Sequence, residues 1–219
     1  MEQGYFITGT DTDVGKTWTT IALMRYFKSQ GKTVVGMKPV AAGCFIQNGQ
    51  LKNEDAFLIQ ENASLQIAYD LINPYAYALP ISPHIAGIHN PVKLVKVLEG
   101  FACLKDKAEI VLVEGAGGWY TPLNEHEDIS DLAKALALPV ILVVGIKLGC
   151  INHAKLSWEA IQDSDLPSAG WIAVCLDPAL QKLDETISTL KAALNTPLLG
   201  VMPYMDKADF DLLAERLVL

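Results

Sequence analysis

The sequence lacks the features that mark secreted, membrane-spanning or disulfide-bonded proteins. Its four cysteines are scattered and never form a Cys-x-x-Cys pair, so we expect reduced thiols in the core of an intracellular protein: Cys44, Cys103, Cys150 and Cys175. The longest uncharged apolar run, residues 135–146, contains a proline and is too short to cross a bilayer. The amino end has no basic segment followed by an apolar stretch, and we expect no signal peptide and a cytoplasmic protein.

Positive charge is also scarce. The chain has 17 Lys and Arg against 25 Asp and Glu, which gives a formal net charge of −8. Nucleic acids and anionic membranes are bound by clustered Lys and Arg, so we expect neither partner. A small anion stays possible, because a few lysines and backbone N–H groups suffice to bind one. Internal repeats are absent, and 219 residues with 51% hydrophobic content are typical of one folded domain with a substantial core.

What the sequence does contain is an alternation of short apolar runs with helical patterns. We expect strands at residues 5–8, 33–40, 109–113, 139–145, 169–175 and 198–202, and helices at residues 17–29 and from residue 151. Continuous apolar strands are buried on both faces, so the pattern predicts an α/β fold with a doubly wound, mostly parallel sheet between helices. Ligands of such sheets bind beyond the carboxyl ends of the strands. We expect one domain over residues 1–219, with the loop-rich residues 41–90 covering the substrate.

The segment TGTDTDVGKT, residues 8–17, leaves the first expected strand and enters a helix. A Gly-Lys-Thr ending at such a place is typical of a phosphate-binding loop, in which backbone N–H groups and the helix N-terminus surround phosphate oxygens. Lys16 would reach the β- and γ-phosphates, and the Thr17 hydroxyl would ligate Mg²⁺. Threonine occupies position 10, where the usual pattern has glycine. The fold is therefore expected to be of the P-loop NTPase type, with a variant loop.

Three further residues follow expected strands or begin a helix. Lys38 ends the second strand, where a second ammonium would help to neutralise a transferring phosphoryl group. Glu114 comes directly after an apolar strand, the placement of the second carboxylate that holds Mg²⁺ in P-loop enzymes. For Asp55 the spacing leaves two interpretations open, a third metal ligand or an acid at a helix N-terminus.

Two other features stay open on the residues alone. Asp11 and Asp13 lie in the loop, where each either shapes a turn toward solvent or faces a cationic second substrate. Residues 149–153 open an expected helix, and its first N–H groups either bind a carboxylate or are simply capped.

The motifs closely resemble those of one family, dethiobiotin synthetase. They occur in order from residue 5 to about residue 204: YFITGTDTDVGKT, GMKPVAAG, NPYAYALPISPHIA, VLVEGAGGWYTPL, LPVILVVGIKLGCINHA and LLGVMPY. The resemblance implies a homodimeric ligase of biotin biosynthesis. It would close the ureido ring of dethiobiotin from 7,8-diaminononanoate and CO₂, with MgATP as co-substrate. The implied route passes through a carbamate and a carbamic–phosphoric anhydride and releases ADP and phosphate.

The resemblance also implies roles for individual residues. The catalytic set would be Thr12, Lys16 and Lys38. The nucleotide would contact Asp13, Val14, Gly15, Lys16, Thr17, Glu114, Gly117, Val174 and Pro203. The diamine and its carbamate would contact Thr12, Lys38, Ala42, Pro80, Ser82 and, across the dimer interface, Gly149, Cys150, Ile151 and Asn152. Mg²⁺ would be held by Thr17, Asp55 and Glu114.

Two positions differ from the family pattern. Ala42 stands where the family often has serine, which removes a side-chain hydrogen bond near the carbamate, worth roughly 1 kcal/mol. Val174 stands where an asparagine that reads the purine edge is expected. Base recognition would then depend on backbone groups near residues 202–204, or the site would accept several nucleotides.

Two other functions fit the sequence less well. A glutamine-dependent ligase of the cobyrinic-acid type needs an amidotransferase domain, for which these 219 residues leave no room. A partitioning or scaffold ATPase usually carries a second lysine inside the phosphate loop and a surface for DNA or membrane. Residues 9–15 contain no lysine and the chain is acidic, which disfavours that reading.

Overall fold

A six-stranded parallel sheet forms the centre of the protein. The structure is a computed structural model that describes residues 4–219, so residues 1–3 of the expected domain lie outside the described part. The strand order is β10-β9-β8-β1-β7-β2. The strands are β1 (Gly4–Gly9), β2 (Val34–Met37), β7 (Ile110–Gly118), β8 (Val140–Ile146), β9 (Ser168–Cys175) and β10 (Leu198–Met202). Every residue of β8 is buried, as a continuous apolar run predicts. The expected doubly wound parallel sheet is confirmed.

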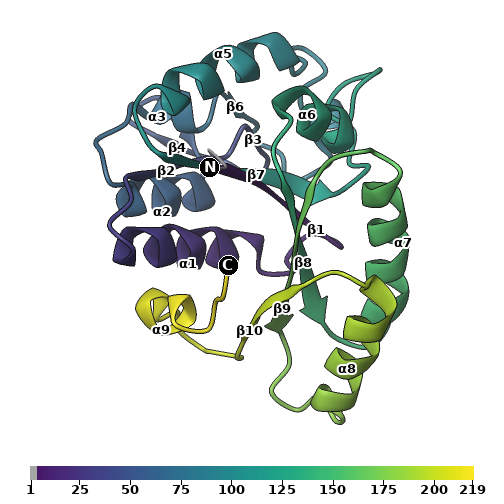
Figure 1. The fold of residues 1–219 in the computed structure, drawn as a ribbon. Helices are drawn as coiled ribbons and strands as arrows, with labels where there is room; N and C mark the ends of the chain where they lie inside the picture. The colour runs from purple at the N-terminus through teal and green to yellow at the C-terminus, as the bar shows by residue number, and fades with distance from the viewer. Residues whose placement is uncertain (1–3) are drawn as a thin grey trace.

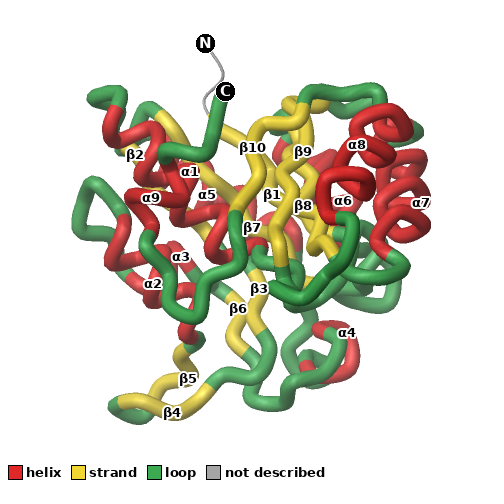
Figure 2. The backbone as a smooth tube through the Cα atoms, turned by 90° about the horizontal axis from the view of Figure 1, so that it is seen from below, coloured by secondary structure: helices red, strands yellow, loops and turns green. Residues whose placement is uncertain are grey.

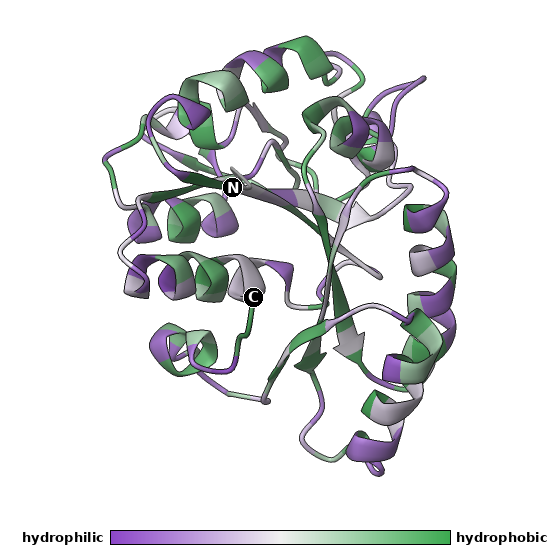
Figure 3. Ribbon diagram, in the orientation of Figure 1, coloured by the Kyte–Doolittle hydropathy of each residue, from purple (hydrophilic) through white to green (hydrophobic). Residues whose placement is uncertain are grey.

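Helices cover both faces of this sheet (Figure 1). One face carries α1 (Lys16–Ser29), α2 (Glu54–Asn62) and α9 (Phe210–Ala214), and the other carries α5 (Leu94–Lys105), α6 (Ile129–Leu136), α7 (Cys150–Gln162) and α8 (Leu183–Leu194). The strands of the central sheet are mainly apolar, whereas the helices around it combine polar and apolar residues (Figure 3). Burial of apolar surface between these layers is therefore the main stabilising term of the fold.

The order of the strands creates a crevice beside β1. The chain leaves β1 in one direction to form β2, and later proceeds from β7 in the opposite direction to β8, β9 and β10. Parallel crossovers are right-handed, so the two directions place their helices on opposite faces. Loops at the carboxyl ends of the central strands consequently diverge, and ligands of such sheets bind at that point.

Residues 41–90 form small elements at one end of the sheet (Figure 2). They contain α2, α3 (Tyr69–Ile72) and α4 (Pro83–Ala86), the pair of β3 (Val40–Ala41) with β6 (Tyr75–Ala76), and the hairpin of β4 (Phe45–Gln47) with β5 (Gln50–Lys52). The hairpin turns at Asn48 and Gly49, which both have positive φ values of 52° and 76°. Asn-Gly is the preferred pair for such a turn. That this region covers the substrate stays a prediction.

Two expected strands have different ends in the structure. The strand expected over residues 33–40 stops at Met37, because Pro39 has no N–H for a sheet, and Val40 starts β3 in a separate sheet. The strand expected over residues 109–113 continues through the glycines to Gly118, which pairs with Gly9 after an irregularity in the pairing of β1 with β7. Glu114 therefore lies within β7 and does not follow it.

The cysteines are only partly as expected. All four are free thiols in the described chain, and Cys44, Cys150 and Cys175 are buried. Cys103 is exposed on α5, so its expected place in the core is wrong. Within residues 4–219, no helix is both long enough and apolar enough to span a membrane.

Candidate active site

The phosphate loop is shaped by a glycine that no other residue replaces easily. Gly15 precedes α1 with φ 91°, a left-handed conformation that L-residues rarely adopt. A Cβ at Gly15 would also lie 2.8 Å from Val174 Cγ1, on the end of β9. Among the described residues no side chain caps α1, so the N–H groups of its first turn are available to an anion.

Lys16 is buried inside this loop. Its Nζ donates a hydrogen bond to the Asp11 backbone carbonyl at 2.7 Å, which bends the side chain over the loop. Burial, reinforced by the positive charge of Lys38, lowers the pKa of Lys16 from 10.5 to about 8. A desolvated ammonium at this place is poorly compensated and would gain from contact with phosphate oxygens.

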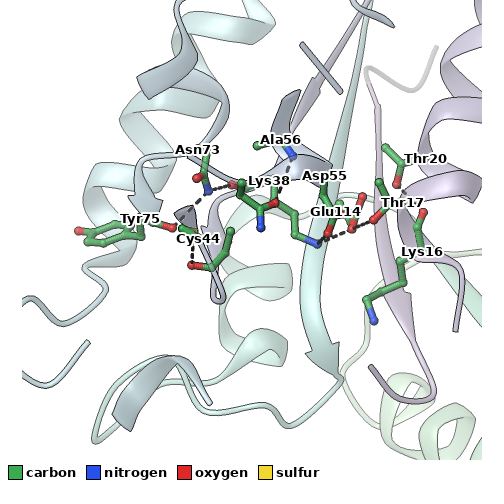
Figure 4. A network of polar contacts seen from close by, with 12 residues as sticks. Lys16, Thr17, Thr20, Lys38, Cys44, Asp55, Ala56, Asn73, Tyr75 and Glu114 are labelled. Atoms are coloured by element: carbon green, nitrogen blue, oxygen red, sulfur yellow. Dashed lines mark hydrogen bonds and ion pairs between the residues drawn. The ribbon is translucent and has the colours of Figure 1, made fainter. Parts of the chain in front are cut away.

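Lys38, Asp55, Glu114 and Thr17 form one polar cluster (Figure 4). The Lys38 ammonium donates to Glu114 Oε1 and lies 3.3 Å from Asp55 Oδ2. The Thr17 hydroxyl donates to the same Glu114 oxygen at 2.9 Å. Burial opposes the charge of Lys38, but the carboxylates of Glu114 and Asp55 outweigh it and raise the pKa of this lysine. Lys38 is therefore a buried, paired cation and not a solvated residue at a strand end.

The local sequence explains why these groups meet. β2 and β7 are neighbours with Met37 opposite Val113, so the next residues along the two strands, Lys38 and Glu114, lie side by side. The backbone of Lys38 is held at both ends, since its N–H donates to Ile72 O at 2.8 Å and its carbonyl accepts from Asn73 Nδ2 at 2.7 Å.

Asp55 reaches the cluster from the first turn of α2. The Asn53 side chain caps this helix by accepting the Ala56 N–H at 3.3 Å. The two interpretations of Asp55 are thus compatible, because it is an acid at a helix N-terminus and also a member of the cluster. Asn53 was not singled out from the sequence, although an asparagine before two acids is a recognisable helix start.

The cluster fits a magnesium ion. Glu114 Oε2 is buried and has no hydrogen-bond partner among residues 4–219, so it has an unused acceptor beside Thr17 and Asp55. Carboxylate and hydroxyl oxygens are the ligands that Mg²⁺ prefers. In the described chain, no group of three or more His, Cys, Asp and Glu residues is arranged to hold a metal. Two carboxylates and a hydroxyl would therefore need phosphate oxygens and water to complete the shell.

A cavity of about 1060 Å³ connects the phosphate loop with residues 80–83. It is lined by most of the residues expected to bind ligands: Thr12, Asp13, Gly15, Lys16, Thr17, Lys38, Ala42, Asp55, Pro80, Ser82, Glu114, Gly117, Val174 and Pro203. Val14 is buried in the core, and Gly149 to Asn152 lie outside the lining at the start of α7. Further lining residues, which the sequence did not single out, include Asn53, Trp119, Cys175, Leu176, Tyr204 and Met205.

The two acids of the loop have different surroundings. Asp13 lines the cavity, in a left-handed conformation with φ 55°. Asp11 accepts the Thr12 N–H at 2.8 Å, and its other carboxylate oxygen lies 3.6 Å from Lys147 Nζ. Of the two acids, Asp13 is therefore the one that lines the cavity.

Comparison with known proteins agrees with this site. A family model described as an AAA domain matches residues 3–210. The ATP-dependent dethiobiotin synthetase BioD of Nitrosospira multiformis is 48% identical over 213 residues, covering 95% of this chain and 92% of that protein. The BioD 1 protein of Escherichia coli is 44% identical over 207 residues, covering 94% of this chain and 92% of its own. This chain belongs to the ATP-dependent dethiobiotin synthetase family.

Membership in the dethiobiotin synthetase family confirms the resemblance seen in the motifs and the expectation of an ATP-dependent ligase of biotin biosynthesis. Solved structures with the same fold are more distant. The MinC:MinD cell division protein complex of Aquifex aeolicus superposes with TM-score 0.59 at 17% identity, covering 98% of this chain and 87% of that one. MinD of Pyrococcus horikoshii, complexed with Mg-ADP, gives TM-score 0.54 at 17% identity, covering 93% and 82%. At this identity the likeness confirms the P-loop NTPase fold only.

Proposed function

We propose that this protein closes the ureido ring of dethiobiotin from 7,8-diaminononanoate, CO₂ and ATP. The observation that carries the proposal is that a phosphate loop, two buried lysines and two carboxylates all line one cavity. A site built for phosphoryl transfer needs positioning and charge neutralisation more than a protein nucleophile.

The proposed reaction has three steps. One substrate amine attacks CO₂ and loses a proton, which forms a carbamate. A carbamate oxygen then attacks the γ-phosphorus of ATP, the bond to the bridging β,γ-oxygen breaks, and ADP leaves with a carbamic–phosphoric anhydride remaining. The second amine attacks the carbamoyl carbon, the carbon–oxygen bond to phosphate breaks, and the nitrogen loses its proton as the ring closes.

Two lysines and a bound Mg²⁺ would neutralise the negative charge that moves during the second step. Lys16, buried with a lowered pKa, is suited to the β- and γ-phosphates. Lys38 and Thr12 line the cavity next to it and would orient the carbamate. Thr17, Asp55 and Glu114 would hold Mg²⁺, which when bound neutralises phosphate oxygens.

The nucleotide would lie across the phosphate loop. Its phosphates would meet the backbone of the loop and the first turn of α1, and its base would lie toward the ends of β9 and β10. The proposed contacts are Asp13, Val14, Gly15, Lys16, Thr17, Glu114, Gly117, Val174 and Pro203. Val14 would contribute its backbone only, because its side chain is buried.

The diamine would occupy the other end of the cavity, with Ala42, Pro80 and Ser82 beside it and residues 41–90 covering it. A second copy of the chain would present Gly149, Cys150, Ile151 and Asn152 to the substrate carboxylate. Gly149 has φ 91°, and among the described residues no side chain caps α7, so its first N–H groups suit a carboxylate. The proposal thus includes a homodimer in the cytoplasm, with the site at the subunit interface.

The direct test is an assay of the purified protein with 7,8-diaminononanoate, bicarbonate and MgATP. We expect dethiobiotin, ADP and phosphate in equal amounts. Absence of the ring product, from protein shown to be folded by circular dichroism, would contradict the proposal.

A pair of lysine variants tests the phosphate loop separately. Lys16→Ala should lose about a hundredfold or more in turnover, because the charge on the transferring phosphoryl group is no longer neutralised. Lys105→Ala removes an exposed lysine of α5 and serves as the matched control. Equal turnover of the two variants would contradict the role of Lys16.

A further inference from the structure

The Lys38 ammonium contacts one oxygen of each carboxylate that a divalent cation would need. It contacts both Glu114 Oε1 and Asp55 Oδ2, and its side chain is only 7% exposed. The Thr17 hydroxyl is bound to the same Glu114 oxygen. Each group of the proposed magnesium site is thus already linked to Glu114 or to Lys38.

The two carboxylates need a positive charge beside them in the absence of a metal. The side chain of Glu114 is completely buried within the sheet, and a buried carboxylate without a counterion is strongly unfavourable. Asp55 brings a second negative charge to the same place. An ammonium between them attracts both and offsets one of the two negative charges, so Lys38 stabilises the arrangement of the two acids before any ligand arrives.

A magnesium ion at this site would compete with the ammonium. Glu114 Oε2 has no hydrogen-bond partner among residues 4–219 and could accept the ion, but Lys38 contacts Glu114 Oε1 and Asp55 Oδ2 on the same two carboxylates. Two cations on one carboxylate pair repel each other, so the metal binds more favourably when the ammonium moves away.

The backbone around Lys38 allows this exchange without refolding. Its N–H and carbonyl are both fixed, by Ile72 and Asn73, so only the side chain is free to move. The side chain has four rotatable bonds and lines the same cavity as Ala42 and Ser82. The ammonium has space there, on the side where the carbamate is expected.

We propose that Lys38 is the resident counterion of the Asp55–Glu114 pair and exchanges with the divalent cation. Metal binding then releases the ammonium into the cavity, where it can orient the carbamate. This inference rests on the proposed magnesium site and deepens it, because it makes Lys38 a positioning residue whose location depends on the metal.

Metal binding by the full chain in the absence of nucleotide and diamine tests the exchange. Free Mn²⁺ is followed by electron paramagnetic resonance during titration of wild type, Lys38→Met and Lys38→Arg. We expect at least tenfold tighter Mn²⁺ binding by Lys38→Met, which has no competing charge, and binding by Lys38→Arg within about twofold of wild type. Equal or weaker binding by Lys38→Met, or no binding by either wild type or Lys38→Met, would overturn the proposal.

A second measurement does not depend on the stability of the methionine variant. Wild-type protein with ¹³C-labelled lysine is titrated with Mg²⁺, and the Lys38 ε-carbon signal is assigned by its loss in Lys38→Arg. The signal should move and saturate together with metal binding. An unchanged Lys38 signal at saturating metal would overturn the exchange. Neither experiment uses the diamine, so a failure of ring formation in the activity assay is a separate result.

Discussion

The side chain of Val174 packs closely against the backbone of Gly15, so that the end of β9 contacts the phosphate loop. A Cβ at Gly15 would lie 2.8 Å from Val174 Cγ1, and Gly15 also has a left-handed φ of 91°. Glycine is therefore needed here for two independent reasons, one of conformation and one of space.

These two reasons can be separated by a double-mutant cycle. Gly15→Ala should destabilise the protein by about 1–3 kcal/mol and weaken nucleotide binding, because strain and collision both act on the loop. In a Val174→Ala background the collision is relieved and the same change should cost less, with only the strain remaining. The measurements are urea unfolding and calorimetric nucleotide affinity. Strict additivity of the two changes would show that Val174 does not support the loop.

Val174 also bears on nucleotide choice. The end of the cavity proposed to hold the base is lined by residues that include Cys175, Leu176, Met202 and Pro203, and none of the described residues that line this end has a side-chain amide. A pocket without such groups discriminates poorly between bases, so we expect turnover with CTP, GTP and UTP within about tenfold of that with ATP. A nucleotide panel at matched Mg²⁺ measures this. A preference for ATP over CTP above about a hundredfold would contradict it.

Lys16 predicts a pH dependence of nucleotide binding. Its pKa of about 8 means that the free protein loses this ammonium as the pH rises above 8, and nucleotide affinity should then fall by up to about tenfold per pH unit. Bound phosphates favour the charged form, so binding near pH 8 should take up a proton. Calorimetry in two buffers of different ionisation enthalpy measures the uptake, and Lys16→Met should abolish it. Wild-type binding without proton uptake at pH 8 would show that Lys16 keeps an ordinary pKa.

The lowered pKa of Lys16 makes the stability of the free protein rise with pH, whereas it makes nucleotide affinity fall. The pKa of Lys16 is lower in the folded protein than in the unfolded chain, so the unfolded chain binds more protons between about pH 8 and 10.5. The contribution of Lys16 to the free energy of unfolding therefore rises with pH across that window, as its buried charge is lost.

The two carboxylates of the cluster should behave differently when neutralised. Glu114→Gln replaces the buried carboxylate that pairs with Lys38 by a neutral amide, and it should lower the free energy of unfolding by about 3–5 kcal/mol. Asp55 is 40% exposed, and Asp55→Asn should cost less than about 1 kcal/mol. Both variants should lose about a hundredfold in turnover at limiting Mg²⁺. Urea unfolding and a Mg²⁺ titration of activity distinguish these effects, and equal destabilisation by the two changes would contradict the burial argument.

Much of this architecture is readable from the sequence. Continuous apolar runs such as residues 140–146 predict buried parallel strands, and a Gly-Lys-Thr between a strand and a helix predicts the phosphate loop. Glu114 and Lys38 were expected near the same crevice because both stand at or near strand ends, and the structure places them in contact.

The remaining details depend on pairing between distant segments. The strand through Gly118 continues because Gly9 lies opposite it, and no local signal in a glycine run reveals that partner. The different surroundings of Asp11 and Asp13 depend on Lys147, which reaches the loop from the turn after β8. Likewise, Val174 looks like an ordinary strand residue until the fold brings it under Gly15.

The position of β1 in the middle of the sheet means that it is translated well before the strands that pair with it. Gly4 pairs with Val111 and Phe6 with Val140, so the first strand leaves the ribosome long before either neighbour exists. The phosphate loop that follows β1 cannot be supported until β9 has also been translated and Val174 is in place. A nascent chain that ends before β9 lacks the Val174 contact with this loop, and we expect the non-local pairing to make folding of the central strands slow.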